Sequence, residues 1–393
     1  MKLIGRSYDT GRAIAVEIVG DCIASVEHEN VNSPPVESLP WIAPGLVDVQ
    51  FNGWGGQEFS AADLTVEKVE RIVEVLGPQG VTQFCPTVTT HSFDVLEHSM
   101  RTLAAACDAS PATARRVVGI HLEGPYLSPE DGPRGAHPRQ HCKPPDWDEF
   151  RRLQDAAGGR ICILTLAPEW EGSPGFIRRA VDAGVLIAIG HTAAETDDIL
   201  AAVDAGARLS THLGNGAHGT IRRHPNYIWD QLAEDRLTAS IIADGHHLPA
   251  SVVKSFVRAK TPQRCILVSD VSGLAGLPPG RYNRSLCDLE ILADGKIVLA
   301  GQEQYLAGAS RPLGMCVTRA MRFAELDLAT AIDMASRGPL ELLGREAPSL
   351  EPDSAADLVL FDLPGAVGDR PPEEIEVRAT IVAGELVFGS VGS

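Results

Sequence analysis

The chain has 393 residues, of which 44% are hydrophobic and 22% charged, so it can bury a large core and is not a disordered protein. Its 34 Lys and Arg residues against 52 Asp and Glu residues give a formal net charge of −18, which argues against nucleic acid or an anionic membrane as a partner. No run approaches the roughly 20 apolar residues of a membrane span. Arg6, Asp9 and Arg12 interrupt the apolar core that a signal peptide would need near the start. The eight cysteines are scattered without a CxxC pair, which predicts reduced thiols and a cytoplasmic protein.

The two ends of the chain share a β-prone character. Residues 1–44 contain short β-prone runs and a proline-rich stretch, and residues 350–393 contain "ADLVLFD" and "VRATIVAGELVFG". Such runs, bounded by turn residues, are typical of short strands. We therefore predict a small β-sandwich domain built from both termini around a central domain of residues 45–349.

Eight strongly apolar, β-prone runs recur through the central region, separated by helical patterns that often end at glycine. Continuous apolar runs are typical of parallel strands covered on both faces. The predicted strands are residues 46–51, 81–87, 117–124, 161–168, 185–192, 208–214, 239–245 and 265–270. Further helical patterns at residues 312–324 and 327–343 would complete the ring. This alternation predicts an α/β fold of the (β/α)8 TIM-barrel type. An open doubly wound sheet is the alternative, but it normally has fewer strands, and no GxGxxG follows the first strand to indicate dinucleotide binding.

Polar side chains end six of the eight predicted strands. In a (β/α)8 barrel the active site lies at the carboxyl ends of the strands. Each polar residue alone could be an ordinary hydrogen-bonded loop residue, but their recurrence at one end of the barrel predicts a site. The residues in question are Gln50, Asn52, His121, Glu123, His191, His212, Asp244, His246, His247 and Asp270.

Glu123, His191 and His212 form a mixed oxygen and nitrogen ligand set that suits one divalent metal ion. Zinc fits this set best, with iron, cobalt and manganese as alternatives. For His212, within "STHLGNGAHG", the competing interpretation is a polar residue in an ordinary glycine-rich turn. His121 lies two residues before Glu123, so both side chains share one face of the strand. We expect His121 to support the ligands as a hydrogen-bonding partner.

Asp270 ends the apolar strand in "LVSDVSG". We predict that it is the general base that takes a proton from the attacking water. The alternative is a helix N-cap for the segment that follows.

Seven motifs resemble those of N-acetylglucosamine-6-phosphate deacetylases, a branch of the amidohydrolase superfamily of metal-dependent barrels. They are "PGLVDVQFNGWGG", "HLEGPYLSP", "GHTAAE", "THLGNGAHG", "IIADGHHLP", "LVSDVSGLAG" and "LAGAS", in that order along residues 41–365. The resemblance implies the same ligand set and the same catalytic aspartate. It also implies one metal per subunit, because Gln50 and Asn52 stand where many amidohydrolases have a pair of metal-binding histidines.

The resemblance assigns further roles on the substrate side. It implies that His137 contacts the substrate near the scissile amide and stabilises the developing oxyanion. It places His247 against the sugar or its phosphate. Without the resemblance, His137 would be interpreted as a loop histidine facing solvent.

The same resemblance places the 6-phosphate at Asn215 and Gly216, with help from an arginine. Arg223, eight positions after Asn215, and its neighbour Arg222 are the candidates. An arginine fork suits a phosphate dianion because it donates two parallel hydrogen bonds. The alternative interpretation is a pair of ordinary surface arginines.

Departures from the family pattern all concern recognition of the substrate. The sequence reads Asn-Gly-Ala-His after "THLG", where the family usually has Asn-Ala-Met; "LAGAS" replaces "LAGS", and His246 replaces an apolar residue. The resemblance therefore implies hydrolysis of an N-acetylated amino-sugar phosphate to acetate and a free amine, with N-acetylglucosamine 6-phosphate as the expected substrate. Alternatives are a related amidohydrolase acting on another N-acylated sugar or sugar phosphate, or a non-catalytic sugar-binding barrel. The family also implies a homodimer.

Overall fold

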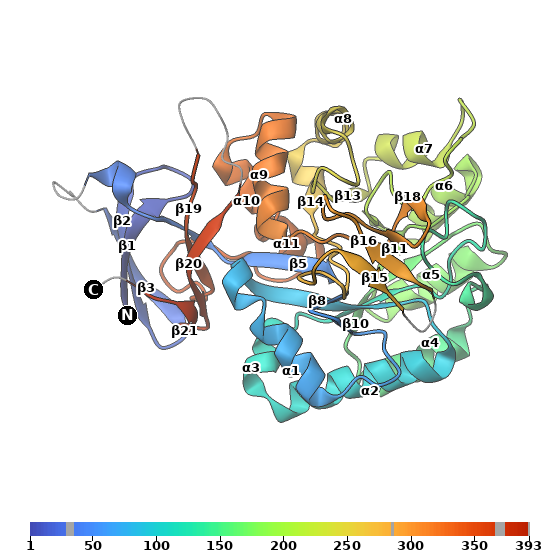
Figure 1. Cartoon of the computed structure of the whole chain (residues 1–393), viewed down its shortest axis with the longest axis horizontal. Helices are drawn as coiled ribbons and strands as arrows, with labels where there is room; N and C mark the ends of the chain where they lie inside the picture. The colour runs from blue at the N-terminus through green and yellow to red at the C-terminus, as the bar shows by residue number, and fades with distance from the viewer. Residues whose placement is uncertain (29–34, 284–286, 366–373, 392–393) are drawn as a thin grey trace.

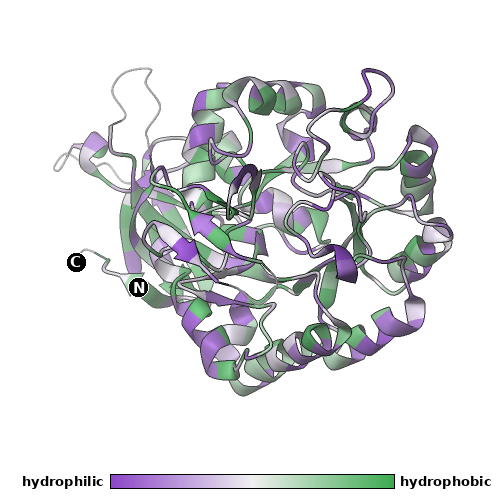
Figure 2. Cartoon of the chain, turned by 45° about the vertical axis from the view of Figure 1, so that its right-hand side comes forward, coloured by the Kyte–Doolittle hydropathy of each residue, from purple (hydrophilic) through white to green (hydrophobic). Residues whose placement is uncertain are grey.

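A computed structural model describes residues 1–28, 35–283, 287–365 and 374–391. The molecule has a large barrel of strands and helices beside a smaller sheet that contains both ends of the chain (Figure 1). The helices around the barrel carry hydrophilic and hydrophobic residues side by side (Figure 2), as expected when one face of a helix packs on the barrel and the other meets water.

All eight predicted barrel strands are present, and each pairs in parallel with its neighbours in chain order. They are β5 (Leu46–Phe51), β8 (Val81–Thr89), β9 (Ile120–Glu123), β10 (Ile161–Leu166), β11 (Leu186–Ile189), β12 (Leu209–Ser210), β13 (Thr238–Ile241) and β14 (Cys265–Leu267). The uninterrupted order from β5 to β14 confirms the barrel and excludes the open doubly wound sheet.

The barrel closes only at its carboxyl end, between β5 and β14. There, the Asp270 amide donates to the Gln50 carbonyl at 2.9 Å, and the Asn52 amide donates to the Val271 carbonyl at 3.0 Å. Farther down, β5 and β14 instead donate hydrogen bonds to the carbonyls of residues 334–335. The closing contacts therefore run through the segments that carry the predicted site residues Gln50, Asn52 and Asp270.

Helices occur in every predicted helical segment. They are α1 (Val66–Glu74), α2 (Phe93–Ala109), α4 (Trp147–Ala156), α5 (Ser173–Asp182), α6 (Thr196–Ala205), α8 (Ala250–Lys260), α9 (Leu313–Ala324), α10 (Leu328–Asp333) and α11 (Arg337–Leu342). Two short helices were not predicted, α3 (Pro111–Arg116) and α7 (Tyr227–Ala233). Local signals fix several ends: Asp146 caps α4 through its carboxylate, and Gly206, with φ of 118°, ends α6.

The terminal strands form one seven-stranded sheet. Its strands are β1 (Lys2–Ser7), β2 (Ala13–Val19), β3 (Cys22–His28), β4 (Trp41–Pro44), β19 (Leu358–Asp362), β20 (Glu376–Val382) and β21 (Glu385–Gly389), in the order β21-β20-β19-β4-β1-β2-β3. The sheet curls, because the turn between β2 and β3 hydrogen-bonds to residues 354–356, just before β19. It encloses its own core, which includes Val16, Ile42 and Ile381. Strands from both termini thus form a small β domain with its own core, as the sequence predicted.

A four-stranded antiparallel sheet between β14 and α9 was not predicted, and we call it the lid sheet. It comprises β15 (Gly280–Tyr282), β16 (Leu289–Ile291), β17 (Ile297–Leu299) and β18 (Gln302–Leu306). Leu274, Leu289, Ile291 and Ile297 give it a small core of its own. In Figure 1 the lid sheet crosses in front of the barrel. A smaller hairpin, β6 (Gly53–Trp54) with β7 (Gln57–Glu58), follows the first barrel strand.

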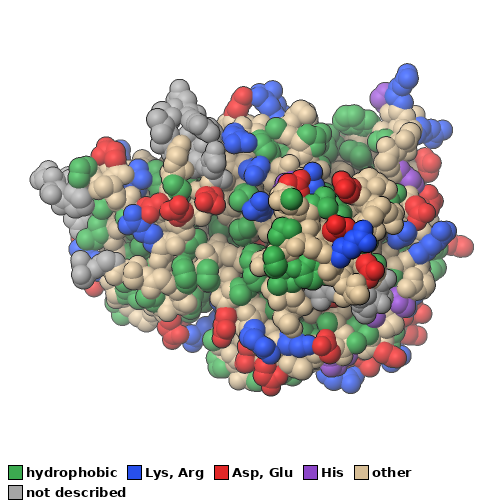
Figure 3. Space-filling view, viewed as in Figure 1, with side chains coloured by type: hydrophobic (Ala, Val, Ile, Leu, Met, Phe, Trp, Pro, Cys, Tyr) green, Lys and Arg blue, Asp and Glu red, His purple; other side chains and the backbone are tan. Residues whose placement is uncertain are grey.

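The surface fits the acidic composition. On the face shown in Figure 3, acidic and basic side chains are interspersed. Among the described residues, no helix is both long enough and apolar enough to cross a membrane.

Candidate active site

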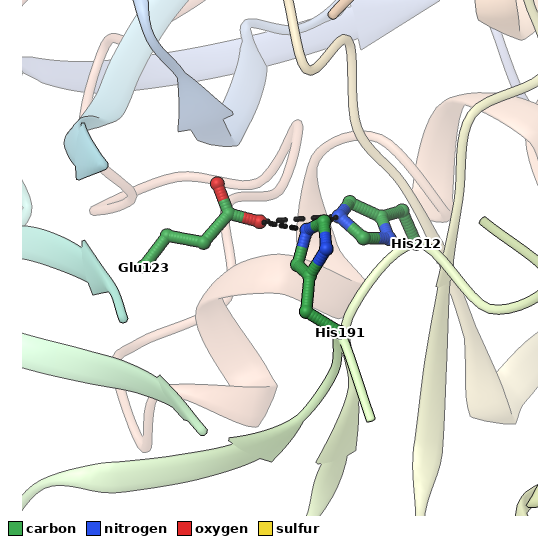
Figure 4. Close-up of side chains that lie close together, drawn as sticks. All are labelled: Glu123, His191 and His212. Atoms are coloured by element: carbon green, nitrogen blue, oxygen red, sulfur yellow. Dashed lines mark hydrogen bonds and ion pairs between the residues drawn. The ribbon is translucent and has the colours of Figure 1, made fainter. Parts of the chain in front are cut away.

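The three predicted metal ligands converge at the carboxyl end of the barrel. Glu123 Oε1 lies 3.1 Å from His212 Nε2 and 3.3 Å from His191 Nε2, and the two Nε2 atoms are 3.0 Å apart. All three side chains are buried, and Figure 4 shows them pointing toward one another. Within the described ranges, they are the only group of three His, Cys, Asp or Glu side chains whose ligand atoms lie within 4.8 Å of one another.

The backbone at these positions is strained. His191, His212 and Asp270 have φ values of 51°, 31° and 49° and are therefore non-glycine residues in the left-handed region. Such a conformation costs on the order of 1–3 kcal/mol per residue and persists where the surrounding structure enforces it. Its recurrence at three barrel-strand ends is typical of a functional site.

Hydrogen bonds orient two of the ligands. The ring of His191 places Nδ1 2.8 Å from the Pro133 carbonyl, so Nδ1 carries a hydrogen and Nε2 is the ring atom turned toward the cluster. Gln50 Nε2 donates to Glu123 Oε1 at 3.0 Å. Burial alone would raise the pKa of Glu123, but its contacts with His191 and His212 hold that pKa well below the usual range. A buried carboxylate with two converging imidazole nitrogens fits a divalent cation.

Asp270 faces the same cavity as the ligands. Its Oδ1 accepts a hydrogen bond of 2.7 Å from Asn52 Nδ2. Burial, together with the nearby charge of Glu123, raises the pKa of Asp270 to about 6. The described contacts do not show the alternative role of Asp270 as a helix N-cap, because its carboxylate faces Asn52 and the cavity.

His121 lies one layer deeper in the barrel. Its Nδ1 is 3.1 Å from the Val49 carbonyl and its Nε2 is 2.7 Å from Thr165 Oγ1. Burial lowers the pKa of His121 to about 4, so its ring is neutral near pH 7. Its link to the ligands is indirect, through Thr165 Oγ1, which lies 2.7 Å from the hydroxyl of Thr211.

A cavity of about 440 Å³ opens above the ligands. His137, from the loop after β9, lines this cavity. The centroids of the His137 and His191 rings are 4.3 Å apart. Burial, reinforced by His191, lowers the pKa of His137 to about 3, so the ring is neutral near pH 7. A neutral imidazole still offers one N–H to a substrate oxygen.

The predicted phosphate-binding residues divide into two groups. Asn215, Gly216 and His247 line the cavity, and His247 Nδ1 is held 2.8 Å from Asp244 Oδ2. Arg222 and Arg223 do not line it; both are exposed, on the loop that precedes α7. No lysine or arginine of the described chain lines the cavity.

Comparison with known proteins agrees with this geometry. Residues 41–387 match the model of the Amidohydrolase family. The chain belongs to the amidohydrolase family. An N-acetylglucosamine-6-phosphate deacetylase from Bos taurus is 33% identical over 358 residues, which cover 88% of this chain and 83% of the relative. An N-acetylgalactosamine-6-phosphate deacetylase from Escherichia coli O157:H7 is 30% identical over 82% of this chain and 83% of its own length.

Solved structures extend the likeness of this amidohydrolase to the whole chain. N-acetyl-D-glucosamine-6-phosphate deacetylase from Mycobacterium smegmatis, in complex with N-acetyl-D-glucosamine-6-phosphate, superimposes with a TM-score of 0.85 at 29% identity. The match covers 98% of this chain and 99% of the other. The resemblance stated from the motifs is thereby confirmed.

Sequence reasoning missed the part of the amidohydrolase cavity that short elements supply. Glu58 comes from β7, Gln304 and Tyr305 come from β18, and Cys287 precedes β16. None of these residues ends a barrel strand, so the strand-end criterion could not find them. His218 also lines the cavity, with Nε2 3.0 Å from Glu130 Oε2 and Nδ1 3.0 Å from the Tyr227 hydroxyl. Its place in "NGAH", two residues after Gly216, was the available signal.

Proposed function

We propose that this amidohydrolase removes the N-acetyl group from N-acetylglucosamine 6-phosphate, giving acetate and glucosamine 6-phosphate. The observation that carries the proposal is the convergence of Glu123, His191 and His212 in one cavity with Asp270 and His137. Relatives named N-acetylglucosamine-6-phosphate deacetylases support the choice of substrate.

The ligand set favours one zinc ion per subunit, with iron, cobalt and manganese as alternatives. Such an ion, when bound, activates water and polarises the amide carbonyl. Asp270 then takes the proton from the attacking water. The protonated Asp270 returns that proton to the leaving nitrogen. His137, buried beside His191, donates a hydrogen bond to the developing oxyanion.

We also propose a homodimer in which Arg223 reaches the cavity of the second copy. A phosphate dianion is best recognised by charge-assisted hydrogen bonds. The described cavity offers Asn215, Gly216 and His247 but no lysine or arginine. Arg223 lies on an exposed loop of the same barrel face, after β12. A cytoplasmic location stays a prediction from the scattered cysteines.

Acetate release and metal content test the function. We expect stoichiometric metal and turnover of N-acetylglucosamine 6-phosphate well above that of unphosphorylated N-acetylglucosamine. N-acetylgalactosamine 6-phosphate is the informative competitor, because the Escherichia coli O157:H7 relative carries that sugar in its name. Preference for N-acetylgalactosamine 6-phosphate would make that sugar the assigned substrate. Metal-loaded protein that releases no acetate from any of the three sugars would refute deacetylation and favour a sugar-binding barrel.

Mixed dimers test the arginine. Asp270→Asn protein lacks the base, and Arg223→Ala protein lacks the proposed phosphate contact. Each is therefore expected to show little activity when the phosphorylated sugar is held well below the raised KM of the Arg223→Ala protein. A hybrid dimer would regain one working site, made of the intact cavity of one subunit and Arg223 of the other. Mixing the unfolded variants and refolding them should therefore restore activity. No recovery, in mixtures shown to contain hybrids, would mean that Arg223 does not act across the interface.

A further inference from the structure

We propose that a second anion site, for a phosphate dianion, lies behind the cavity wall. It is formed where the loop after β13, the turn between β16 and β17 of the lid sheet, and the start of α9 meet. Its donors are His246, Ser310, Arg311 and Arg319. We call this group the basic cluster. It is separate from the substrate site, because none of the four residues lines the cavity.

Close packing of two glycines brings the three segments of the basic cluster together. A Cβ placed on Gly245 would lie 2.4 Å from Arg319 Nη1, so the Arg319 side chain packs directly on the loop after β13. A Cβ placed on Gly295 would lie 3.2 Å from Arg311 Nη2 and 3.4 Å from Ser310 Oγ. The turn of the lid sheet therefore rests on the residues that lead into α9.

The basic cluster gathers hydrogen-bond donors that have no partner. Thirteen buried side-chain N and O atoms of the described chain lack a hydrogen bond, and four of them are His246 Nε2, Ser310 Oγ, Arg311 Nε and Arg319 Nε. Buried polar groups are normally satisfied, so such a concentration calls for an acceptor. All four atoms can donate, so an acceptor such as an anion would satisfy them.

The surrounding charges do not supply that acceptor. Asp294 Oδ2 lies 2.9 Å from Lys296 Nζ, and Asp244 Oδ2 lies 2.8 Å from His247 Nδ1, so each nearby carboxylate already has a cationic or imidazole partner. Among the described residues, Arg311 and Arg319 form no ion pair.

The start of α9 adds to the positive potential. This helix has 12 residues, its N-cap is Pro312, no side chain caps it, and its first turn contains no acidic residue. The partial positive charge of its free N–H groups is therefore uncompensated, and it favours an anion near the residues that precede the helix. Together with the arginines, this favours a bound anion.

A phosphate group matches the basic cluster in charge and shape. Arginine forks recognise the oxygens of phosphate through parallel hydrogen bonds. The net charge of −18 disfavours a long polyanion such as a nucleic acid. The bound group is therefore inorganic phosphate or a small phosphate ester.

Occupation of the site would hold the lid sheet against the barrel. Gly295 belongs to the turn of the lid sheet, whereas Arg319 belongs to the barrel helix α9. His246 adjoins His247, and Ser310 follows Gly308 by two residues; both His247 and Gly308 line the substrate cavity. An anion bound to the basic cluster would therefore hold the lid sheet in place more firmly as the phosphate concentration rises.

Calorimetric titration of the metal-loaded protein with inorganic phosphate tests the proposal. The starting protein is Arg223→Ala, in which the arginine proposed for the substrate phosphate is absent. We expect it to bind phosphate, and we expect the added changes Arg311→Gln and Arg319→Gln to weaken that binding at least about tenfold, a loss of about 1.4 kcal/mol. Arg101→Gln with Arg151→Gln is the matched control, because it removes two exposed arginines of α2 and α4 and changes the net charge equally.

Two further readouts keep the result interpretable. Hydrogen exchange of residues 289–299 should slow on addition of phosphate in the Arg223→Ala protein but not after loss of Arg311 and Arg319. Arg311→Lys, which keeps the charge and loses the fork, should bind with intermediate strength if folding is intact. The same titration with glucosamine 6-phosphate shows whether the basic cluster binds a phosphate ester or inorganic phosphate more tightly.

The proposal is overturned if phosphate binding is the same with and without Arg311 and Arg319, or if Arg223→Ala alone abolishes it. Either result is distinct from failure of the deacetylase assignment, which is judged by acetate release from the wild-type protein.

Discussion

The inner and outer halves of the cavity are built differently. The inner half consists of side chains at the ends of barrel strands, and hydrogen bonds or strained backbone hold them in place, as with Glu123 and His191. The outer half consists of loops and the lid sheet, and it contains no lysine or arginine of the described chain. The described chain thus brings the proposed catalytic side chains together within one subunit, whereas its cavity supplies no cationic side chain for the proposed phosphate contact.

The largest expected effect belongs to the inner half. Asp270→Asn should lower kcat by about 10² to 10⁴, because it removes the general base and keeps the side-chain volume. Metal content should stay at the wild-type level, since Asp270 is not one of the three converging ligands. Stopped assays of acetate release with metal analysis measure both quantities. An active variant would assign the proton transfer to another group.

A second prediction concerns the support beneath the inner half. Asp48 on β5 is fully buried, and burial raises its pKa to about 7 even though the amides of Gln50 and Ser269 donate to Oδ1. Because the folded-state pKa exceeds the unfolded value of about 3.9, protonated Asp48 stabilises the fold. That contribution is complete below about pH 4 and is lost as the pH rises toward 7.

Asp48→Asn should therefore be more stable than the wild type at pH 8, by on the order of a few kcal/mol, and the gain should shrink toward pH 4. The substituted amide can keep the carbonyl oxygen at the Oδ1 position, where the two backbone amides donate. Urea unfolding across this range measures the difference, and Asp182→Asn, at an exposed position on α5, is the control. A gain that does not depend on pH would show that Asp48 is ionised in the folded protein.

The same division explains what the sequence could predict. The barrel strands were predictable because each is a continuous apolar run, and the ligands were predictable because they end such runs, as Glu123 does on β9. The lid sheet was not, since three of its four strands have only three residues and carry too little periodicity to distinguish from loop. The position of Arg223 relative to the cavity could not be predicted either. It is set by the conformation of a loop and, in the proposed dimer, by the position of the second subunit.

The third prediction concerns the outer half. Arg223→Ala should raise KM for N-acetylglucosamine 6-phosphate by about 10- to 150-fold, as expected for loss of a hydrogen bond to a charged group worth about 1.5–3 kcal/mol. Turnover of saturating substrate and activity on the unphosphorylated sugar should change little. Arg222→Ala is the matched control, because Arg222 is exposed and lies 3.6 Å from Glu195. Equal effects of the two substitutions would attribute the loss to general charge.

The smallest expected effect again concerns the inner half of the cavity. It tests whether a hydrogen bond from a residue that is not itself a ligand helps to position the metal ligands. Gln50 Nε2 donates to Glu123 Oε1, so Gln50→Ala should free the carboxylate to rotate and weaken metal binding by about 10- to 100-fold. Competition with a chelator gives the affinity directly. Gln83→Ala is the control, since Gln83 also lies on a barrel strand but donates to Asp357, on the side of the terminal sheet. Unchanged affinity in Gln50→Ala would mean that this hydrogen bond does not position Glu123, whose other described side-chain contacts within hydrogen-bond distance are with His191 and His212 themselves.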